Sequence, residues 1–382
     1  MRHIGIYVHI PFCMSKCIYC DFYSVTDTTS QEKYIQAVIK QIRSFKRKAK
    51  GTITDSVYFG GGTPSIIKPE YIRDILNEIS KTFTLSPNCE ISMEMNPGTV
   101  TSDALSKYKS YGINRLSMGL QSAHNTELRM LGRIHSRQDF ETSFAMCRIE
   151  GFDNINIDLM YGLPYQKTEY LLQSVEYATS LNPEHISLYG LKVEPNTPLA
   201  SKTSLTERIP DENTQYQMYM QATEYLEKHG YEQYEISNFA KSGKQCRHNL
   251  IYWHSREYIG FGAGASSYFN DELYSYVKNI DSIIDAPTDP LKTVCDVEKI
   301  NTNKEKAKQY LMLAFRLTEG INLLEYAERF NLNFENEYGT AVEKYVSSGF
   351  MQKTQTGYRL TKKGFMVSNF ILSDILDFTK KE

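Results

Sequence analysis

The chain has 382 residues, more than one ordinary domain, so we expect a main domain of about 250 residues and a smaller one. Its formal net charge of −2 gives no long-range attraction to nucleic acid or anionic lipid. No apolar run reaches the roughly 18 residues of a membrane span, and the N-terminus lacks a small-residue cleavage site. We therefore expect a soluble, cytoplasmic protein with no nucleic-acid partner and no transmembrane segment, and at most weak membrane association.

The first predicted element is an apolar strand over Ile4–Ile10, and a loop with three cysteines follows it. Cys13, Cys17 and Cys20 form a C-x3-C-x2-C run. A [4Fe–4S] cluster usually takes four cysteines, so three thiolates leave one iron open to a ligand that is not protein. A structural zinc site needs four ligands, and no second C-x2-C or histidine pair is present. A thioredoxin-like pair would use only Cys17 and Cys20. The loop therefore favours an iron–sulfur cluster over both alternatives.

Five further apolar strands alternate with amphipathic helices. The strands are expected at Ser56–Phe59, Cys89–Met95, Arg115–Leu120, Ile155–Met160 and His185–Leu191. Helical spacing lies between them, at Tyr34–Ile42, Ile72–Ile79 and Tyr170–Ala178. This alternation is typical of right-handed βαβ units in a parallel sheet. Over residues 1–240 the sequence predicts an α/β fold, a partial, open (β/α)6 barrel.

Glycine or polar residues stand at the ends of several predicted strands, where barrels of this kind collect their functional groups. Gly60–Pro64 reads Gly-Gly-Gly-Thr-Pro, while Glu94, Gln121 and Asp158 end other strands. Glycines let the backbone approach a ligand closely, but a triple glycine fits a plain tight turn equally well. A carboxylate such as Glu94 is costly to bury unless it is paired. A backbone group or an arginine could also satisfy it.

The pattern changes after about Phe239. Residues 241–295 are rich in Gly, Ser, His and aromatic residues and end in a proline- and aspartate-containing connector. Residues 296–382 are predicted to hold helices, two short strands within 349–360, and a last helix over Lys362–Leu376. This order resembles a winged-helix module. Because no basic stripe accompanies it, we expect packing or partner docking there and not DNA binding.

The cysteine loop and its flanks, His9-Ile-Pro-Phe-Cys13 and Tyr19-Cys-Asp-Phe22, resemble the signature of the radical S-adenosylmethionine (SAM) superfamily. The closest resemblance is to the branch of oxygen-independent coproporphyrinogen III oxidases (HemN) and haem chaperones (HemW). It implies a TIM-like radical SAM barrel, and a [4Fe–4S] cluster on the three cysteines with SAM on its open iron. It also implies a low-potential electron donor. The matching motifs run in order over nearly the whole chain.

The resemblance also implies which residues contact SAM. Carboxylate side chains can accept hydrogen bonds from the ribose hydroxyls and the amine of SAM, and a glycine segment can receive its amino group. The planar guanidinium of Arg133 suits the carboxylate of SAM. For Tyr7 or Tyr19 alone, core packing would be the default. The SAM positions implied in this sequence are Tyr7, Tyr19, Gly61, Gly62, Thr63, Glu94, Gln121, Arg133 and Asp158.

Two features bear on the choice between chaperone and oxidase. Phe22 stands where HemN-like oxidases carry a fourth cysteine, and HemW-like chaperones also have Phe there. His248-Asn249-x-x-Tyr252-Trp253 resembles the HNxxYW element with which HemW-like chaperones handle haem. Histidine is a usual haem-iron ligand, and aromatic rings pack on a porphyrin face. Without the resemblance, His248 would be a satisfied structural histidine.

The resemblance therefore implies a haem chaperone that binds a [4Fe–4S] cluster, SAM and haem, and delivers haem to client haemoproteins. The main alternative is a coproporphyrinogen III oxidase of porphyrin biosynthesis, which decarboxylates two propionates. A radical SAM enzyme with an unrelated substrate is a third possibility. Whether the chain is an enzyme stays open, because the SAM site looks intact while Phe22 replaces the fourth cysteine.

Overall fold

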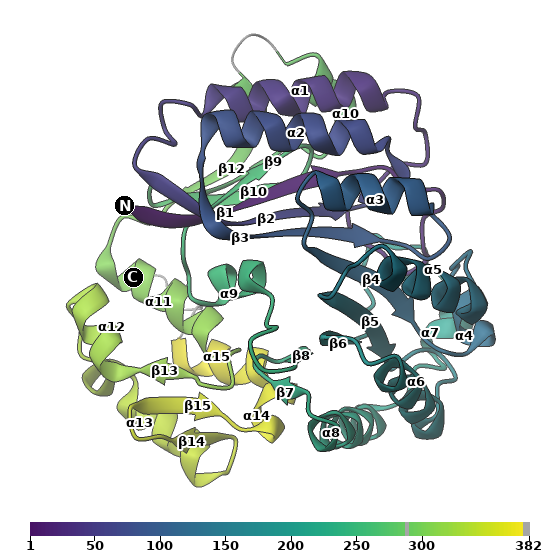
Figure 1. The fold of residues 1–382 in the computed structure, drawn as a ribbon. Helices are drawn as coiled ribbons and strands as arrows, with labels where there is room; N and C mark the ends of the chain where they lie inside the picture. Colours follow the sequence, from purple (N-terminus) through teal and green to yellow (C-terminus); the bar gives the residue numbers. More distant parts are fainter. Residues whose placement is uncertain (287–289, 377–382) are drawn as a thin grey trace.

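One long, curved sheet organises most of the molecule (Figure 1). The structure, a computed structural model, describes residues 1–286 and 290–376. Within these residues, twelve strands form the sheet in the order β12-β11-β10-β9-β1-β2-β3-β4-β5-β6-β8-β7. Strands β1 to β6 pair in parallel. Because β12 and β7 end the sheet without pairing to each other, the barrel is open, and the predicted partial barrel is confirmed.

All six predicted strands are present, with ends that differ by a few residues. They are β1 (Arg2–Ile10), β2 (Thr52–Gly61), β3 (Thr84–Met95), β4 (Arg115–Gln121), β5 (Ile155–Tyr161) and β6 (His185–Gly190). Helices lie on their outer face, as Figure 1 shows. These helices are α1 (Gln31–Ser44), α2 (Pro69–Thr82), α3 (Ser102–Ser110), α5 (Arg137–Ile149), α6 (Thr168–Ser180) and α8 (Glu212–Lys228). The short helices α4 (Asn125–Met130) and α7 (Thr203–Thr206) lie instead beside the cysteine loop.

Local sequence explains where several of these helices begin. The Thr101 and Asp211 side chains accept backbone N–H bonds at the starts of α3 and α8, and Ser136 and Asp139 form a reciprocal capping box on α5. Pro69 occupies the first turn of α2, where its missing N–H costs nothing. The apolar stripes of α1 and α2 join one core with alternate residues of the strands.

Four further strands extend the sheet beyond β1. They come from the segment after Phe239, where the sequence pattern indicated no strands: β9 (Tyr258–Phe261), β10 (Ser266–Phe269), β11 (Glu272–Tyr276) and β12 (Val294–Lys299). Strand β9 pairs in parallel with β1, and the other three follow as antiparallel neighbours. The helices α9 (Arg247–Trp253) and α10 (Ile280–Ile284) accompany them. The predicted domain limits at residues 240 and 295 stay predictions, although these strands attach residues 258–299 to the main sheet.

The C-terminal residues form a helical domain with its own aromatic core. Its helices and three-stranded wing agree with the predicted order, except that the single helix expected over Lys362–Leu376 is broken at Val367 and a short strand precedes α12. The elements are α11 (Asn303–Ala314), β13 (Ile321–Asn322), α12 (Leu323–Phe330), α13 (Phe334–Ser347), β14 (Met351–Lys353), β15 (Gly357–Leu360), α14 (Lys362–Met366) and α15 (Ser368–Leu376). In the described part of the chain, no helix is long and apolar enough to cross a membrane.

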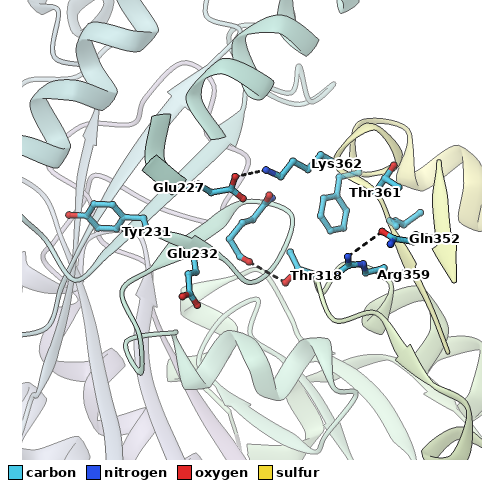
Figure 2. A pocket seen from close by; sticks show the side chains of 11 residues that line it. Glu227, Tyr231, Glu232, Thr318, Gln352, Arg359, Thr361 and Lys362 are labelled. Carbon is cyan, nitrogen blue, oxygen red and sulfur yellow. Dashed lines mark hydrogen bonds and ion pairs between the residues drawn. The ribbon is translucent and has the colours of Figure 1, made fainter. Parts of the chain in front are cut away.

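The C-terminal domain lies between the two ends of the curved sheet (Figure 1). At one end it meets β7 (Glu232–Gln233) and β8 (Asn238–Ala240), where a groove of about 540 Å³ separates the two parts. Figure 2 shows Lys362 paired with Glu227 across this groove. The Thr318 hydroxyl also donates to the Gln233 carbonyl. At the other end, Arg329 donates to two backbone carbonyls just after α9. The groove contains none of the predicted site residues.

Candidate functional site

A cavity of about 430 Å³ opens at the carboxyl ends of the parallel strands. It gathers side chains from the cysteine loop and from β2, β3, β4, β5 and β6. Every predicted site residue except Tyr7 and His248 lines it: Cys13, Cys17, Tyr19, Cys20, Gly61, Gly62, Thr63, Glu94, Gln121, Arg133 and Asp158. The residues predicted at the strand ends therefore lie in one shared site, as expected for a barrel of this type.

The cysteine loop forms one wall of the cavity and is held by backbone bonds. Cys13 N donates to the Val25 carbonyl at 2.9 Å, while Ile18 N donates to Leu131 O at 3.1 Å. The three thiols are half-buried and free of disulfides. Burial raises the pKa of Cys20 to about 11, so its thiolate needs a positive partner. Among residues 1–286 and 290–376, no three His, Cys, Asp or Glu side chains are grouped tightly enough to hold a metal ion.

The glycine segment packs directly on the cysteine loop. Gly62 N donates to Ile10 O and Thr63 N to Phe12 O, both at 2.8 Å. A Cβ on Gly62 would lie 2.6 Å from the Phe12 carbonyl oxygen, so a side chain there would push the loop away. Gly61 N donates to Glu94 at 3.1 Å. The amides of this segment are therefore used inside the protein, and what it can offer a ligand is carbonyl oxygen, the acceptor that an ammonium group requires.

Two carboxylates lie deeper in the cavity. Glu94 accepts bonds from the Tyr58 hydroxyl at 3.0 Å and from the Gly61 amide. Asp158 accepts from Ser117 Oγ at 3.1 Å and from Asn156 Nδ2 at 2.7 Å. Burial, and next the charge of Asp158, raises the pKa of Glu94 to about 7. This acid pair favours a cationic ligand with hydroxyl or amine donors.

Arg133 also lines the cavity. Its guanidinium donates to Asn96 Oδ1 at 2.6 Å, to Gly119 O at 3.0 Å and to Cys17 Sγ at 3.6 Å. A Cβ on Gly119 would lie 3.1 Å from this guanidinium and 2.7 Å from the Gln121 amide, so a side chain there would push both groups from their positions. The buried Arg133 Nε has no partner in the structure. One N–H group of the Arg133 guanidinium is thus left for a ligand.

Several lining residues were not predicted. They include Tyr58, Asn96, Ser117, Gly119, Met160 and Tyr189. Each lies an even number of residues from another lining residue on the same strand or just beyond its end. Side chains alternate between the two faces of a strand, so residues two apart point into the same interior. Counting in steps of two from Gly60, Glu94, Gln121 and Asp158 would have found most of them.

The structure places His248 outside this cavity. Its ring lies on α9, 1% exposed, with Nδ1 2.8 Å from Ser56 Oγ and Nε2 2.7 Å from the Tyr252 hydroxyl. Burial lowers its pKa to about 3. Both nitrogens are therefore engaged, as in the structural interpretation of this histidine. A haem contact at His248 stays a prediction, and an iron atom would have to displace Ser56 or Tyr252 to reach the ring.

Tyr7 is likewise absent from the cavity lining. Its hydroxyl lies 3.0 Å from His9 Nδ1, and its ring stacks near Tyr58 at a centroid distance of 6.3 Å. A Cβ on Gly60 would lie 3.1 Å from both the Tyr7 ring and the Glu94 carboxylate, so Tyr7 packs beside Glu94 on the inner face of the sheet without lining the cavity.

Comparison with known proteins decides the family. A sequence profile of the radical SAM superfamily matches residues 7–178, and one of the HemN C-terminal domain matches residues 301–367. The chain is 34% identical to the heme chaperone HemW of Buchnera aphidicola subsp. Schizaphis graminum, over 98% of each chain. It is 32% identical to HemW of Bacillus subtilis, over 97% of this chain and 98% of the relative. The chain belongs to the HemW family.

The HemW fold of this chain is also that of a solved relative. The structure of coproporphyrinogen III oxidase (HemN) from Escherichia coli matches it with a TM-score of 0.85 at 20% identity, covering 99% of this chain and 91% of the other. In this HemW-family chain, Phe22 is 63% exposed where it lines the cavity. The position that carries cysteine in HemN-like oxidases therefore presents an apolar ring to solvent.

Because the pKa of Glu94 is raised, we expect any SAM binding by the anaerobically reconstituted protein to depend on pH. SAM is cationic, so it favours the ionised carboxylate, and its affinity should rise about tenfold between pH 6 and pH 8. His9 and His135 have pKa values of about 4 and do not titrate in this range. Calorimetric titration across this range measures the effect.

A Glu94→Gln variant is the control. It should bind SAM at least about tenfold more weakly at pH 8, with a much smaller dependence on pH. The folded carboxyl has a raised pKa, so its contribution to stability is present below pH 4.5 and is lost as the pH rises through 7. The variant should therefore resist thermal unfolding better than the wild type at pH 8. The same pH slope in both proteins would exclude Glu94 as the titrating group.

Proposed function

We propose that this chain is a haem chaperone that holds a [4Fe–4S] cluster on Cys13, Cys17 and Cys20, binds SAM, and passes haem to client haemoproteins. The observation that carries the proposal is the cavity in which three free thiols meet a buried acid pair and an arginine. Its support is the full-length similarity to heme chaperones named HemW, including a 31% identical one from Escherichia coli. A protein with these features works where thiols stay reduced, which fits the cytoplasm.

The residues present fit both cofactors. The three thiols are not grouped around one metal ion, but each thiolate of a [4Fe–4S] cluster binds a different iron, so they can supply its ligands. The buried guanidinium of Arg133 beside Cys17 has one unpartnered donor for the SAM carboxylate. Glu94 and Asp158 can accept the hydroxyl and amine donors, and the glycine segment can accept the ammonium group. When bound, the cluster supplies one electron for cleavage of SAM. The chain itself orients SAM and keeps water away.

A coproporphyrinogen III oxidase is the second candidate. The complete acid–arginine cavity and the HemN-like fold favour it. Phe22 counts against it, because the oxidase motif places a cysteine at this position. A decarboxylase of this branch would therefore have to work without that thiol.

One reconstituted sample can distinguish the two functions. We expect the anaerobic protein to bind about one equivalent of haem and to form no protoporphyrinogen IX from coproporphyrinogen III in the presence of SAM and a reductant. Haem binding is followed by its visible absorbance, and porphyrinogen products by chromatography after oxidation. Formation of protoporphyrinogen IX with matching consumption of SAM would contradict the chaperone proposal.

The substitution Phe22→Cys is a matched control. It restores the cysteine of the oxidase motif at an exposed position, so the fold should not change. If the variant also forms no protoporphyrinogen IX, the missing thiol is not the sole barrier to oxidase activity.

A further inference from the structure

A second cavity, of about 400 Å³, lies away from the proposed SAM site. It is enclosed by the end of α9, the strands β9 to β12 and the helix α11 of the C-terminal domain. It shares no lining residue with the first cavity. Most of its wall is aromatic or aliphatic: Tyr252, Tyr258, Tyr268, Leu273, Ile300, Met312 and Leu313.

The aromatic side chains give this second cavity rigid walls. Tyr252 and Tyr258 meet edge to face, with ring centroids 4.5 Å apart, and Tyr258 pairs with Tyr268 in the sheet. Met312 on α11 is 37% exposed and adds a polarisable, adaptable thioether to the opposite side. Rigid rings facing a flexible sulfur suit a flat apolar ligand.

Two cations stand at the same cavity without a counter-ion. In the part of the chain that the structure describes, neither Arg256 nor Lys308 forms an ion pair. Of the two acids in the lining, Glu305 is occupied by the amides of Asn301 and Thr302 at the start of α11, and Glu298 stands on β12. The cavity thus combines an apolar wall with two cations outside any ion pair and two acids, and the cations can pair with a ligand that carries carboxylates.

The cavity also contains an unsatisfied polar atom. Gln309 Oε1 is buried with no hydrogen-bond partner. An unpaired buried acceptor costs free energy that a ligand donor or a water molecule can recover.

We propose that haem docks in this second cavity, with its porphyrin face against Tyr258, Tyr268 and Met312 and its propionates toward Arg256 and Lys308. The inference rests on the proposed function and gives the haem a place that the buried His248 ring does not offer. His248 then acts as a positioning residue, because its bond to the Tyr252 hydroxyl fixes one wall of the cavity. The volume is at the small end for ligand sites, so part of the haem stays exposed for transfer.

Two variants of the full-length protein test this site by titration with haemin. Met312→Glu places a charge on the apolar wall, and the double variant Arg256→Glu with Lys308→Glu reverses both cations. Each should weaken haemin binding at least about tenfold. Leu324→Glu, at an exposed apolar position of α12, and Lys33→Glu with Lys40→Glu, on the exposed side of α1, are the matched controls and should bind as the wild type does.

A second probe separates the two kinds of contact. The dimethyl ester of protoporphyrin IX has no free carboxylates, so it should bind the wild type more weakly than protoporphyrin IX does. The double charge reversal should not weaken its binding further, whereas Met312→Glu should. Far-ultraviolet circular dichroism confirms that each variant is folded.

The outcomes separate this inference from the proposed function. If the wild type binds no haemin, both fail. If it binds haemin and both cavity variants retain the wild-type affinity, the chaperone proposal stands and this site is wrong. If a folded His248→Gln variant loses haemin binding while both cavity variants keep it, His248 contacts the haem and the second cavity does not.

Discussion

Replacing any one of Cys13, Cys17 and Cys20 by alanine is expected to abolish the brown chromophore of the anaerobically reconstituted protein. A [4Fe–4S] cluster that already leaves one iron without a protein ligand has no thiolate to spare. The three thiols line the same cavity, from one loop that backbone bonds hold in place. Visible absorbance and bound iron per chain measure the loss, and we expect both to fall close to zero.

Cys295→Ala provides the matched control. Cys295 is also a half-buried free cysteine, but it lies on β12, where its sulfur contacts Ser275 and Asp296. This variant should reconstitute as the wild type does. Full iron content in any of the three loop variants would show that the ligand set is wrong.

Glu90→Gln should destabilise the fold by about 3 kcal/mol, because it breaks a buried charge network. Glu90 is 7% exposed on β3, and its carboxylate accepts the backbone amides of Arg247 and His248 at 3.2 and 3.3 Å. Arg115, buried alongside, interacts with its charge. A glutamine leaves Arg115 without that charge and turns one donor toward the amides of α9.

Urea unfolding followed by the fluorescence of Trp253 measures this cost. Trp253 is the chain's one tryptophan, it ends α9, and Arg316 lies 5.4 Å from its ring, so its emission reports the docking of that helix. Glu32→Gln, an exposed acid in the first turn of α1, is the control and should shift stability by less than about 0.5 kcal/mol. An unchanged midpoint in Glu90→Gln would mean that α9 does not depend on this carboxylate.

The main barrel and most of the candidate site were predictable from sequence because their signals are local. Each parallel strand is a short apolar run, and every second residue toward its carboxyl end faces the cavity. Glu94, Gln121 and Asp158 could therefore be placed without knowledge of their neighbours. Arg133 lies in a loop after α4, and only the family resemblance pointed to it.

The parts of the fold and site that could not be predicted depend on contacts between distant parts of the chain. Strand β9 is four residues long and pairs with β1, which lies some 250 residues earlier, so no local pattern indicates it. His248 is similar: its partner Ser56 is 192 residues away. A sequence motif shows that a histidine is present, but not whether its two nitrogens are already occupied.

The direct packing of Gly62 on Phe12 links the two proposed cofactor sites. The same pair of backbone bonds that positions the glycine segment also holds the start of the cysteine loop. A substitution that breaks this packing would move the cysteine loop together with the carbonyl groups proposed to receive SAM. A side chain at Gly62 would thus disturb the proposed cluster site and the proposed SAM site at the same time.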